Sequence, residues 1–154
     1  MGIFNDSEKI ELIQEMLKSG ECVSLNITGK SMNPFLKDGI DTVVLKSFDH
    51  YSKGDVVLFL KNGNTPVLHR IYRMSGEKFS AVGDAQTMIE TGIDASWILG
   101  KAVSVTHNGR PLSDTDIIWK FYENFWTVMP IRKALFKIHN SMKKSLFDKV
   151  HCLI

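Results

Sequence analysis

The sequence predicts a mainly β fold: a curled, antiparallel, barrel-like sheet with a short N-terminal helix before it and a helical C-terminal tail after it. Three observations support this prediction. Many short apolar runs, separated by glycine-containing turns, fill the middle of the chain, as in barrels and curled sheets. One stretch before them has apolar residues at helical spacing, and such spacing returns after about Ser113. We therefore expect one domain over 1–154, divided into a helix (1–20), a β core (21–110) and the tail (111–154).

The N-terminal helix is predicted between a capping serine, Ser7, and a terminating glycine, Gly20. Its apolar residues at helical spacing are Ile10, Leu12, Ile13, Met16 and Leu17. They make the helix amphipathic, and we expect it to belong to the same domain as the β core.

The strands of the β core are predicted from short apolar segments. The first of them alternates apolar and polar residues, as a half-buried strand does. The segments are 23–27, 42–45, 56–60, 67–72, 78–82 and 98–106. Asn62-Gly63 lies between two of these runs and is a strong hairpin signal, and residues 107–110 form a second turn of this type.

The tail combines aromatic and basic residues. Four aromatic side chains are expected to pack on the sheet: Trp119, Phe121, Phe125 and Trp126. Residues 131–149 then show a second helical pattern with basic residues between the apolar ones. Two interpretations stay open for 131–149: either its lysines face solvent, or the segment makes a peripheral contact with a membrane surface or a partner.

The composition is that of an ordinary globular protein, with 44% hydrophobic and 23% charged residues among 154. A net charge of +2 is too small to indicate nucleic acid as a partner. Cys22 and Cys152 form neither a disulfide framework nor a metal pattern, and we expect no metal and no cofactor. The N-terminus lacks a secretory signal, and no apolar run reaches the ~18 residues of a membrane span, so we expect a cytoplasmic protein.

A serine on a tight loop is the first candidate for catalysis. Ser31 lies between a predicted strand and a turn that Gly29 and Pro34 fix. Such a turn can expose a hydroxyl while leaving nearby backbone N–H groups free to stabilise an oxyanion. Because an unassisted serine is a poor nucleophile, a general base has to lie within hydrogen-bonding reach of it.

His69 is the predicted base, since an imidazole with a pKa of about 6.5 accepts a proton at neutral pH. Asp84 can orient the ring as the third member of a triad. Lys30 is the alternative base, but its place beside Ser31 on a tight loop turns its side chain away. Purely structural roles also stay open: Ser31 as a turn serine, His69 as a core histidine and Asp84 as a turn-stabilising aspartate.

Five segments, taken together, resemble a known family. Thr28-Gly29-x-Ser31-Met32-x-Pro34 resembles the nucleophile box of signal peptidase I and the related S24/S26 serine peptidases. Four further segments resemble the family's next boxes in the same order: residues 53–59, 68–71, 82–84 and 98–103. Five boxes in the right order are a far more specific signal than any one of them. The resemblance is to the Ser/His form, without a membrane anchor.

The resemblance implies a signal-peptidase or LexA-type β fold and a serine endopeptidase that cleaves a leader- or signal-type segment of a protein or precursor peptide. It implies Ser31 as nucleophile, His69 as base and Asp84 as third residue. The substrate would lie in extended conformation along strand edges, and the Ser31 amide would hold the oxyanion. The other residues that it places at the oxyanion and substrate site are Thr28, Gly29, Met32 and Pro34.

Two other functions stay open. One is a self-cleaving regulator of the same superfamily, although such proteins carry a lysine base where this chain has His69, and residues before Cys22 are too few for a helix-turn-helix domain. The other is a catalytically inactive peptide-binding or membrane-surface adaptor module, which the basic, aromatic tail favours.

Overall fold

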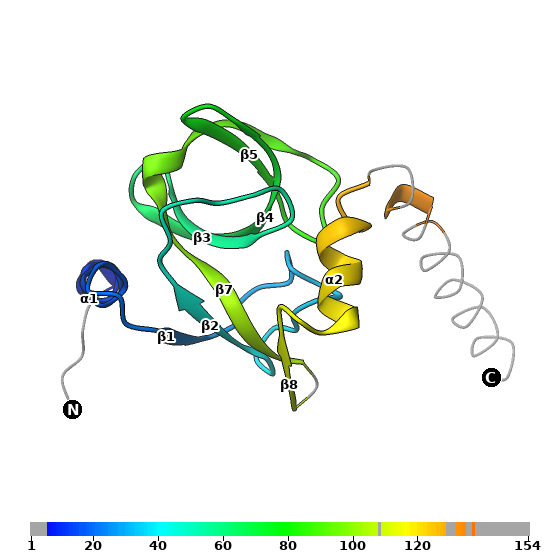
Figure 1. Ribbon diagram of the computed structural model, residues 1–154, viewed down its shortest axis with the longest axis horizontal. Coiled ribbons are helices and arrows are strands. Elements are labelled where there is room, and N and C mark those ends of the chain that lie inside the picture. Colours follow the sequence, from blue (N-terminus) through cyan, green and yellow to red (C-terminus); the bar gives the residue numbers. More distant parts are fainter. Residues whose placement is uncertain (1–5, 108, 129–131, 135–136, 138–154) are drawn as a thin grey trace, which may run out of the picture.

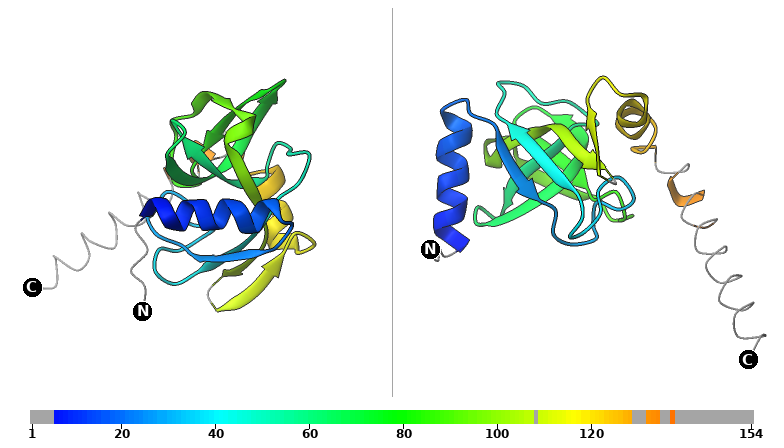
Figure 2. Two further views of the ribbon diagram at one scale, coloured as in Figure 1. Left: turned by 90° about the vertical axis from the view of Figure 1, so that its left-hand side faces the viewer. Right: turned by 90° about the horizontal axis from the view of Figure 1, so that it is seen from below.

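The structure is a computed structural model that describes residues 6–107, 109–128, 132–134 and 137 (Figure 1). The helices in this part of the chain are α1 (Asp6–Lys18), the short 3₁₀ helix η1 (Ala95–Trp97) and α2 (Ile117–Asn124). Figures 1 and 2 place α1 and α2 at opposite ends of a curled sheet. This arrangement confirms the predicted mainly β fold with an N-terminal helix and a helical C-terminal part.

One sheet of eight strands makes up the described β core, and all its strand pairs are antiparallel. The strands are β1 (Val23–Asn26), β2 (Thr42–Lys46), β3 (Val56–Lys61), β4 (Thr65–Ser75), β5 (Lys78–Val82), β6 (Glu90–Asp94), β7 (Ile98–His107) and β8 (Arg110–Ser113). Their order in the sheet is β1-β2-β7-β3-β4-β5-β6, and β8 also pairs with β7. The long β7 therefore joins the β1–β2 side of the sheet to the β3–β6 side.

The predicted strands and the first hairpin are confirmed. Each predicted segment lies in one of the strands, with ends that differ by only a few residues. Asn62 and Gly63 both take positive φ angles, 54° and 78°, and connect β3 to β4 in a tight turn. Positive φ at both central residues is the backbone conformation for which Asn-Gly is favoured.

Two strands, β6 and β8, are not among the sequence predictions. β6 contains Gly92, and Ile93 is its only buried residue, so no apolar alternation marks it. β8 has four residues, one of them Pro111, and pairs only with β7 in the described sheet. Short edge strands with glycine or proline carry a weak sequence pattern, because tertiary pairing rather than local preference forms them.

The sheet separates two groups of buried apolar residues, and β3 contributes to both. Val56 and Leu58 belong to the first group, whereas Val57 and Phe59 belong to the second. Successive side chains of a strand point to opposite faces, so a strand covered on both faces needs an uninterrupted apolar run. The first group also contains Leu17 of α1, Trp119 of α2 and the apolar residues of the loop after β1: Met32, Phe35 and Leu36.

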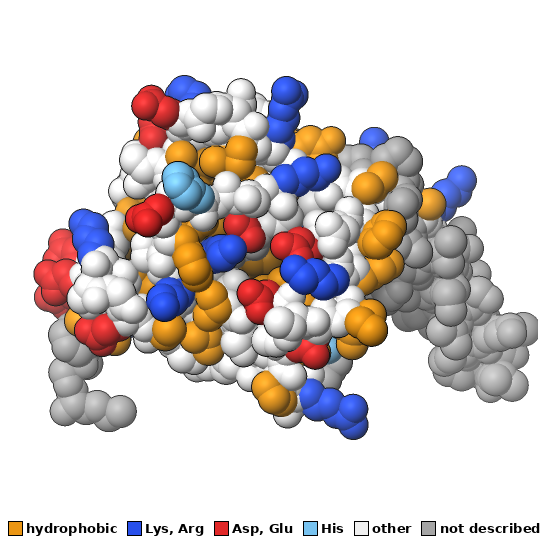
Figure 3. Space-filling model, in the orientation of Figure 1, with side chains coloured by type: hydrophobic (Ala, Val, Ile, Leu, Met, Phe, Trp, Pro, Cys, Tyr) orange, Lys and Arg blue, Asp and Glu red, His pale blue; other side chains and the backbone are white. Residues whose placement is uncertain are grey.

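The aromatic residues of the tail divide between two faces, which corrects the prediction that all four pack on the sheet. Trp119 and Trp126 are buried, with 4% and 6% exposure, but Phe121 and Phe125 are 44% and 53% exposed. The buried Trp119 and the exposed Phe121 lie on different sides of α2, and beyond its end at Asn124 the exposed Phe125 and the buried Trp126 divide in the same way. Hydrophobic side chains accordingly gather over α2 at the right of Figure 3.

The predicted membrane or partner surface at 131–149 lies outside the described residues, apart from 132–134 and 137. Within the part of the chain that the structure describes, no helix has the length and apolar character needed to cross a membrane.

Candidate active site

Ser31 and His69 line the same cleft, whose volume is about 770 Å³. Its walls come from α1, β1, the loop that follows β1, β2, β3, the first half of β4 and the segment that leads into β6. Thr28, Gly29 and Met32 also line it, whereas Pro34 and Lys30 are exposed outside this lining set. The structure therefore brings the predicted nucleophile and base to one site, and leaves Lys30 away from it.

The loop that carries Ser31 is closed at its stem and anchored by its own apolar residues. The Ile27 N–H donates to the Asp41 carbonyl, and the Gly39 N–H donates to the Ile27 carbonyl, both at 2.9 Å. Met32 is 2% exposed, so the residue after the serine points into the core. A closed stem and a buried neighbour hold the serine at the surface of the cleft.

Gly29 shapes this loop but does not offer its amide to a substrate. Its φ of +86° lies in the left-handed region that favours glycine. Its N–H donates to the Asp38 carboxylate at 2.9 Å. The expected contribution of the Gly29 amide to an oxyanion site is therefore not available in this conformation.

The turn at 83–86 touches both catalytic candidates. The Ala85 N–H donates to the Ser31 carbonyl at 2.7 Å. Gly83 lies so close that an added Cβ would be 2.7 Å from the Ser31 carbonyl oxygen and 3.0 Å from His69 Nε2. Only a residue without a Cβ fits there, and the backbone of Ser31 and the imidazole converge on this one point.

His69 lies on β4, opposite Val57 of β3, and is 4% exposed. Its ring packs edge-on against Phe59, with 6.3 Å between ring centroids. Burial lowers the pKa of His69 below its usual value, whereas the negative charges of Glu90 and Asp84 act in the opposite direction. Burial has the larger effect, so the imidazole is neutral at pH 7 and can accept a proton.

The carboxylate in contact with His69 belongs to Glu90, a residue that the sequence reasoning missed. Glu90 Oε1 lies 3.3 Å from His69 Nδ1 without hydrogen-bond alignment, and the two groups form an ion pair only when the imidazole is protonated. Its other oxygen lies 2.6 Å from Lys61 Nζ. Glu90 begins β6, the strand without a clear pattern, and the available signal was an acidic residue shortly after Gly83-Asp84.

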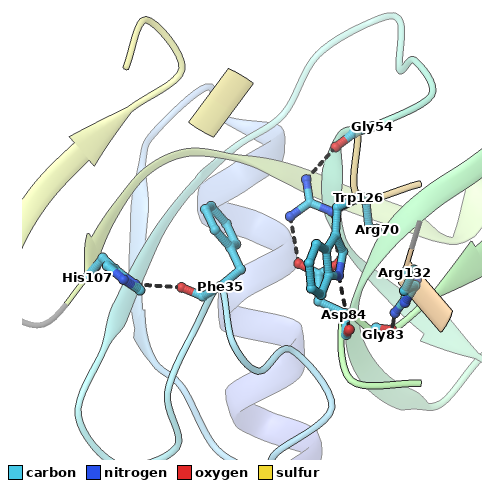
Figure 4. Close-up of polar contacts among 8 residues, drawn as sticks. All are labelled: Phe35, Gly54, Arg70, Gly83, Asp84, His107, Trp126 and Arg132. Atoms are coloured by element: carbon cyan, nitrogen blue, oxygen red, sulfur yellow. Dashed lines mark hydrogen bonds and ion pairs between the residues drawn. The ribbon is translucent and has the colours of Figure 1, made fainter. Parts of the chain in front are cut away.

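Asp84 is placed differently from the sequence prediction. Its two carboxylate oxygens accept hydrogen bonds from Arg70 Nε at 2.9 Å and Arg70 Nη2 at 2.7 Å (Figure 4). Arg70 Nη1 donates to the Gly54 carbonyl at 2.8 Å, and the guanidinium lies 4.9 Å from the centre of the Phe35 ring. Both charged residues have 0% exposure. Asp84 thus belongs to a buried ion pair beside the site, and its charge acts on His69 from a distance.

A mainly antiparallel β domain with a loop serine and a buried histidine on one cleft has the layout of a serine-peptidase domain. The family described as Peptidase S24-like matches residues 2–103, and the chain belongs to that family. No curated protein matches the chain. Family membership supports a peptidase or a self-cleaving role in general terms. The matched residues include Ser31, His69, Asp84 and Glu90, but α2 and Arg132 lie beyond them.

Proposed function

We propose that the protein is a serine endopeptidase of the Ser/His form, with Ser31 as nucleophile and His69 as general base. The observation that carries this proposal is that the Ser31 backbone and His69 Nε2 converge on Gly83, and that Ser31 and His69 line one cleft. Further support comes from the lowered pKa of His69, because a neutral imidazole is the form that a general base requires.

The proposed reaction proceeds in two steps. Ser31 Oγ attacks the peptide carbonyl while His69 Nε2 takes its proton, and the proton then passes to the leaving amine as the C–N bond breaks. A water molecule, deprotonated by His69, hydrolyses the ester on Ser31. We infer that the Ser31 amide and the Thr28 hydroxyl stabilise the oxyanion, since Thr28 lines the cleft and the Gly29 amide is bound to Asp38.

An extended segment of a protein or precursor peptide fits this cleft best. β1 pairs only with β2 in the described sheet, and β4 pairs with β5 only from Arg70 onward. Both β1 and the first half of β4 therefore have an open edge, and both line the cleft. An open edge can hold a peptide as an added strand, and the leader- or signal-type segment that we propose as substrate would bind in this way.

The test of the proposed function is cleavage of a peptide library, with the products identified by mass spectrometry. Internal cuts by the wild type, absent with Ser31→Ala, are the expected result. Binding of peptides by both proteins without any cut would instead indicate the inactive peptide-binding module. A cut found only within the chain itself, again dependent on Ser31, would indicate the self-cleaving regulator.

Activity is expected to fall as the pH drops below that of an ordinary histidine, because protonated His69 cannot act as a base. Burial lowers the pKa of His69, so the acid limb of kcat/KM should lie below about pH 6.5. Peptide cleavage measured between about pH 8 and about pH 5 checks this prediction. A rate that stays flat over that whole range would count against His69 as the base.

Glu90, rather than Asp84, is proposed to orient the His69 ring. Glu90→Gln is expected to lower kcat by about 10- to 100-fold, as small misplacements of catalytic groups do, without unfolding the protein. It should also move the acid limb to lower pH, since the Glu90 charge raises the pKa of His69. Steady-state kinetics over a pH series measure both effects.

The matched variant is Asp84→Asn, which breaks the pairing with Arg70. We expect its main effect to be a loss of thermal stability, because it leaves a buried guanidinium without its carboxylate. If Asp84→Asn instead folds normally and loses more activity than Glu90→Gln, the orienting carboxylate is Asp84.

A further inference from the structure

The turn at 83–86 lies against both Ser31 and His69, and three side chains hold it in place. Arg70 pairs with the Asp84 carboxylate, as described above. Trp126 Nε1 donates to the Asp84 carbonyl at 3.0 Å, and Arg132 Nη2 donates to the Gly83 carbonyl (Figure 4). Two of the three therefore come from the C-terminal part of the chain, beyond the family match.

Arg132 reaches this turn from 49 positions along the chain and has 0% exposure. Its guanidinium lies 5.9 Å from the centre of the Trp126 ring. Removing a guanidinium from water is costly, and buried charged groups can often be replaced together by apolar residues of similar volume without loss of stability. A buried arginine that donates to the backbone next to His69 and Ser31 therefore calls for an explanation other than stability.

We propose that Arg132 is a positioning residue for catalysis: by holding the Gly83 carbonyl, it fixes the 83–86 turn against Ser31 and His69. The proposal rests on the proposed function. The Ala85 N–H that binds the Ser31 carbonyl and the Gly83 backbone that packs on His69 Nε2 lie in this same turn. If the turn moved, the distance between the nucleophile and its base would change.

The charge of Arg132 provides an independent signature. The charged groups that act on His69 are Glu90 and Asp84, which raise its pKa, and Lys61 and Arg132, which lower it. Loss of the Arg132 charge should therefore move the pKa of His69 upward, opposite in direction to the effect of Glu90→Gln. A purely structural arginine elsewhere in the fold would not move this titration.

The experiment compares Arg132→Met with Arg132→Lys, and uses Lys133→Met, at the exposed neighbouring position, as the control. For Arg132→Met we expect kcat to fall about 10- to 100-fold with little change in KM. The acid limb of the rate, and the His69 titration followed by NMR, should both move to higher pH. Arg132→Lys keeps the charge but loses the planar fork, so we expect the wild-type titration and a loss of about fivefold in kcat. Lys133→Met should behave as the wild type.

The outcomes separate this proposal from the proposed function. A wild-type kcat or an unmoved His69 titration in Arg132→Met would overturn the positioning role. Should that variant fail to fold, a wild-type kcat in Arg132→Lys would overturn it instead. If the wild type cleaves no peptide, the proposed function fails. The effect of Arg132 on His69 can still be tested in that case, and an unmoved His69 titration in Arg132→Met would overturn it as well.

Discussion

Alanine in place of Ser31 or His69 is expected to lower kcat/KM for peptide cleavage by about 10⁴-fold or more. Each substitution removes one half of a unit in which the hydroxyl is nucleophilic only when the imidazole takes its proton. The double variant should therefore be no slower than the slower of the two single variants. Cleavage of one fluorogenic peptide by the three proteins measures this, with active-site concentrations matched.

The control for this comparison is Lys30→Ala, which alters the residue next to the nucleophile on the same loop. Lys30 is exposed outside the cleft, so we expect wild-type rates. Losses that simply add in the Ser31 and His69 double variant would contradict the paired mechanism. A loss in Lys30→Ala as large as in His69→Ala would point to the lysine as the base.

The elements that the sequence predicts are those whose pattern is local. Alternating or continuous apolar runs mark β1 to β5 and β7. A strand that is buried on one face alternates apolar and polar residues, and a strand that is buried on both faces is apolar throughout. β6 has no such pattern: Glu90 pairs with Ala81 and Ile93 with Phe79, and the partner strand supplies the reason for its conformation. Its position, and with it that of Glu90, could not be obtained from its own residues.

The candidate site follows the same division. Ser31 and His69 are found by their motifs. The partners of the Glu90 and Asp84 carboxylates, in contrast, depend on which face of β4 each carboxylate contacts. His69 and Arg70 are neighbours on β4, so their side chains point to opposite faces. His69 packs near Phe59 and the cleft, whereas Arg70 lies over Phe35 and binds the Asp84 carboxylate on that face. The contact of Arg132 with Gly83 likewise arises only in the folded chain.

Arg70→Met is expected to lower the free energy of unfolding by about 3–5 kcal/mol, the largest effect on stability that we predict. Methionine fills much of the same volume, so the main loss is electrostatic: Asp84 would remain at 0% exposure without the two hydrogen bonds that Arg70 donates. The Gly54 carbonyl would lose its donor too. Urea unfolding followed by tryptophan fluorescence measures the change, since Trp126 donates to the Asp84 carbonyl and reports on this region.

Two further variants isolate the ion pair as the cause. Arg73→Met alters an exposed arginine on the same strand and should change stability by no more than about 0.5 kcal/mol. The double variant Arg70→Met with Asp84→Leu removes both charges, so it should recover much of the stability that Arg70→Met loses. The alternative outcome is that Asp84→Leu lowers the stability of Arg70→Met by as much as it lowers that of the wild type. The loss in Arg70→Met would then come from packing against Phe35 rather than from an unpaired carboxylate. The 83–86 turn links this ion pair to the cleft, because it contains Asp84, which pairs with Arg70, and Ala85, whose N–H donates to the Ser31 carbonyl.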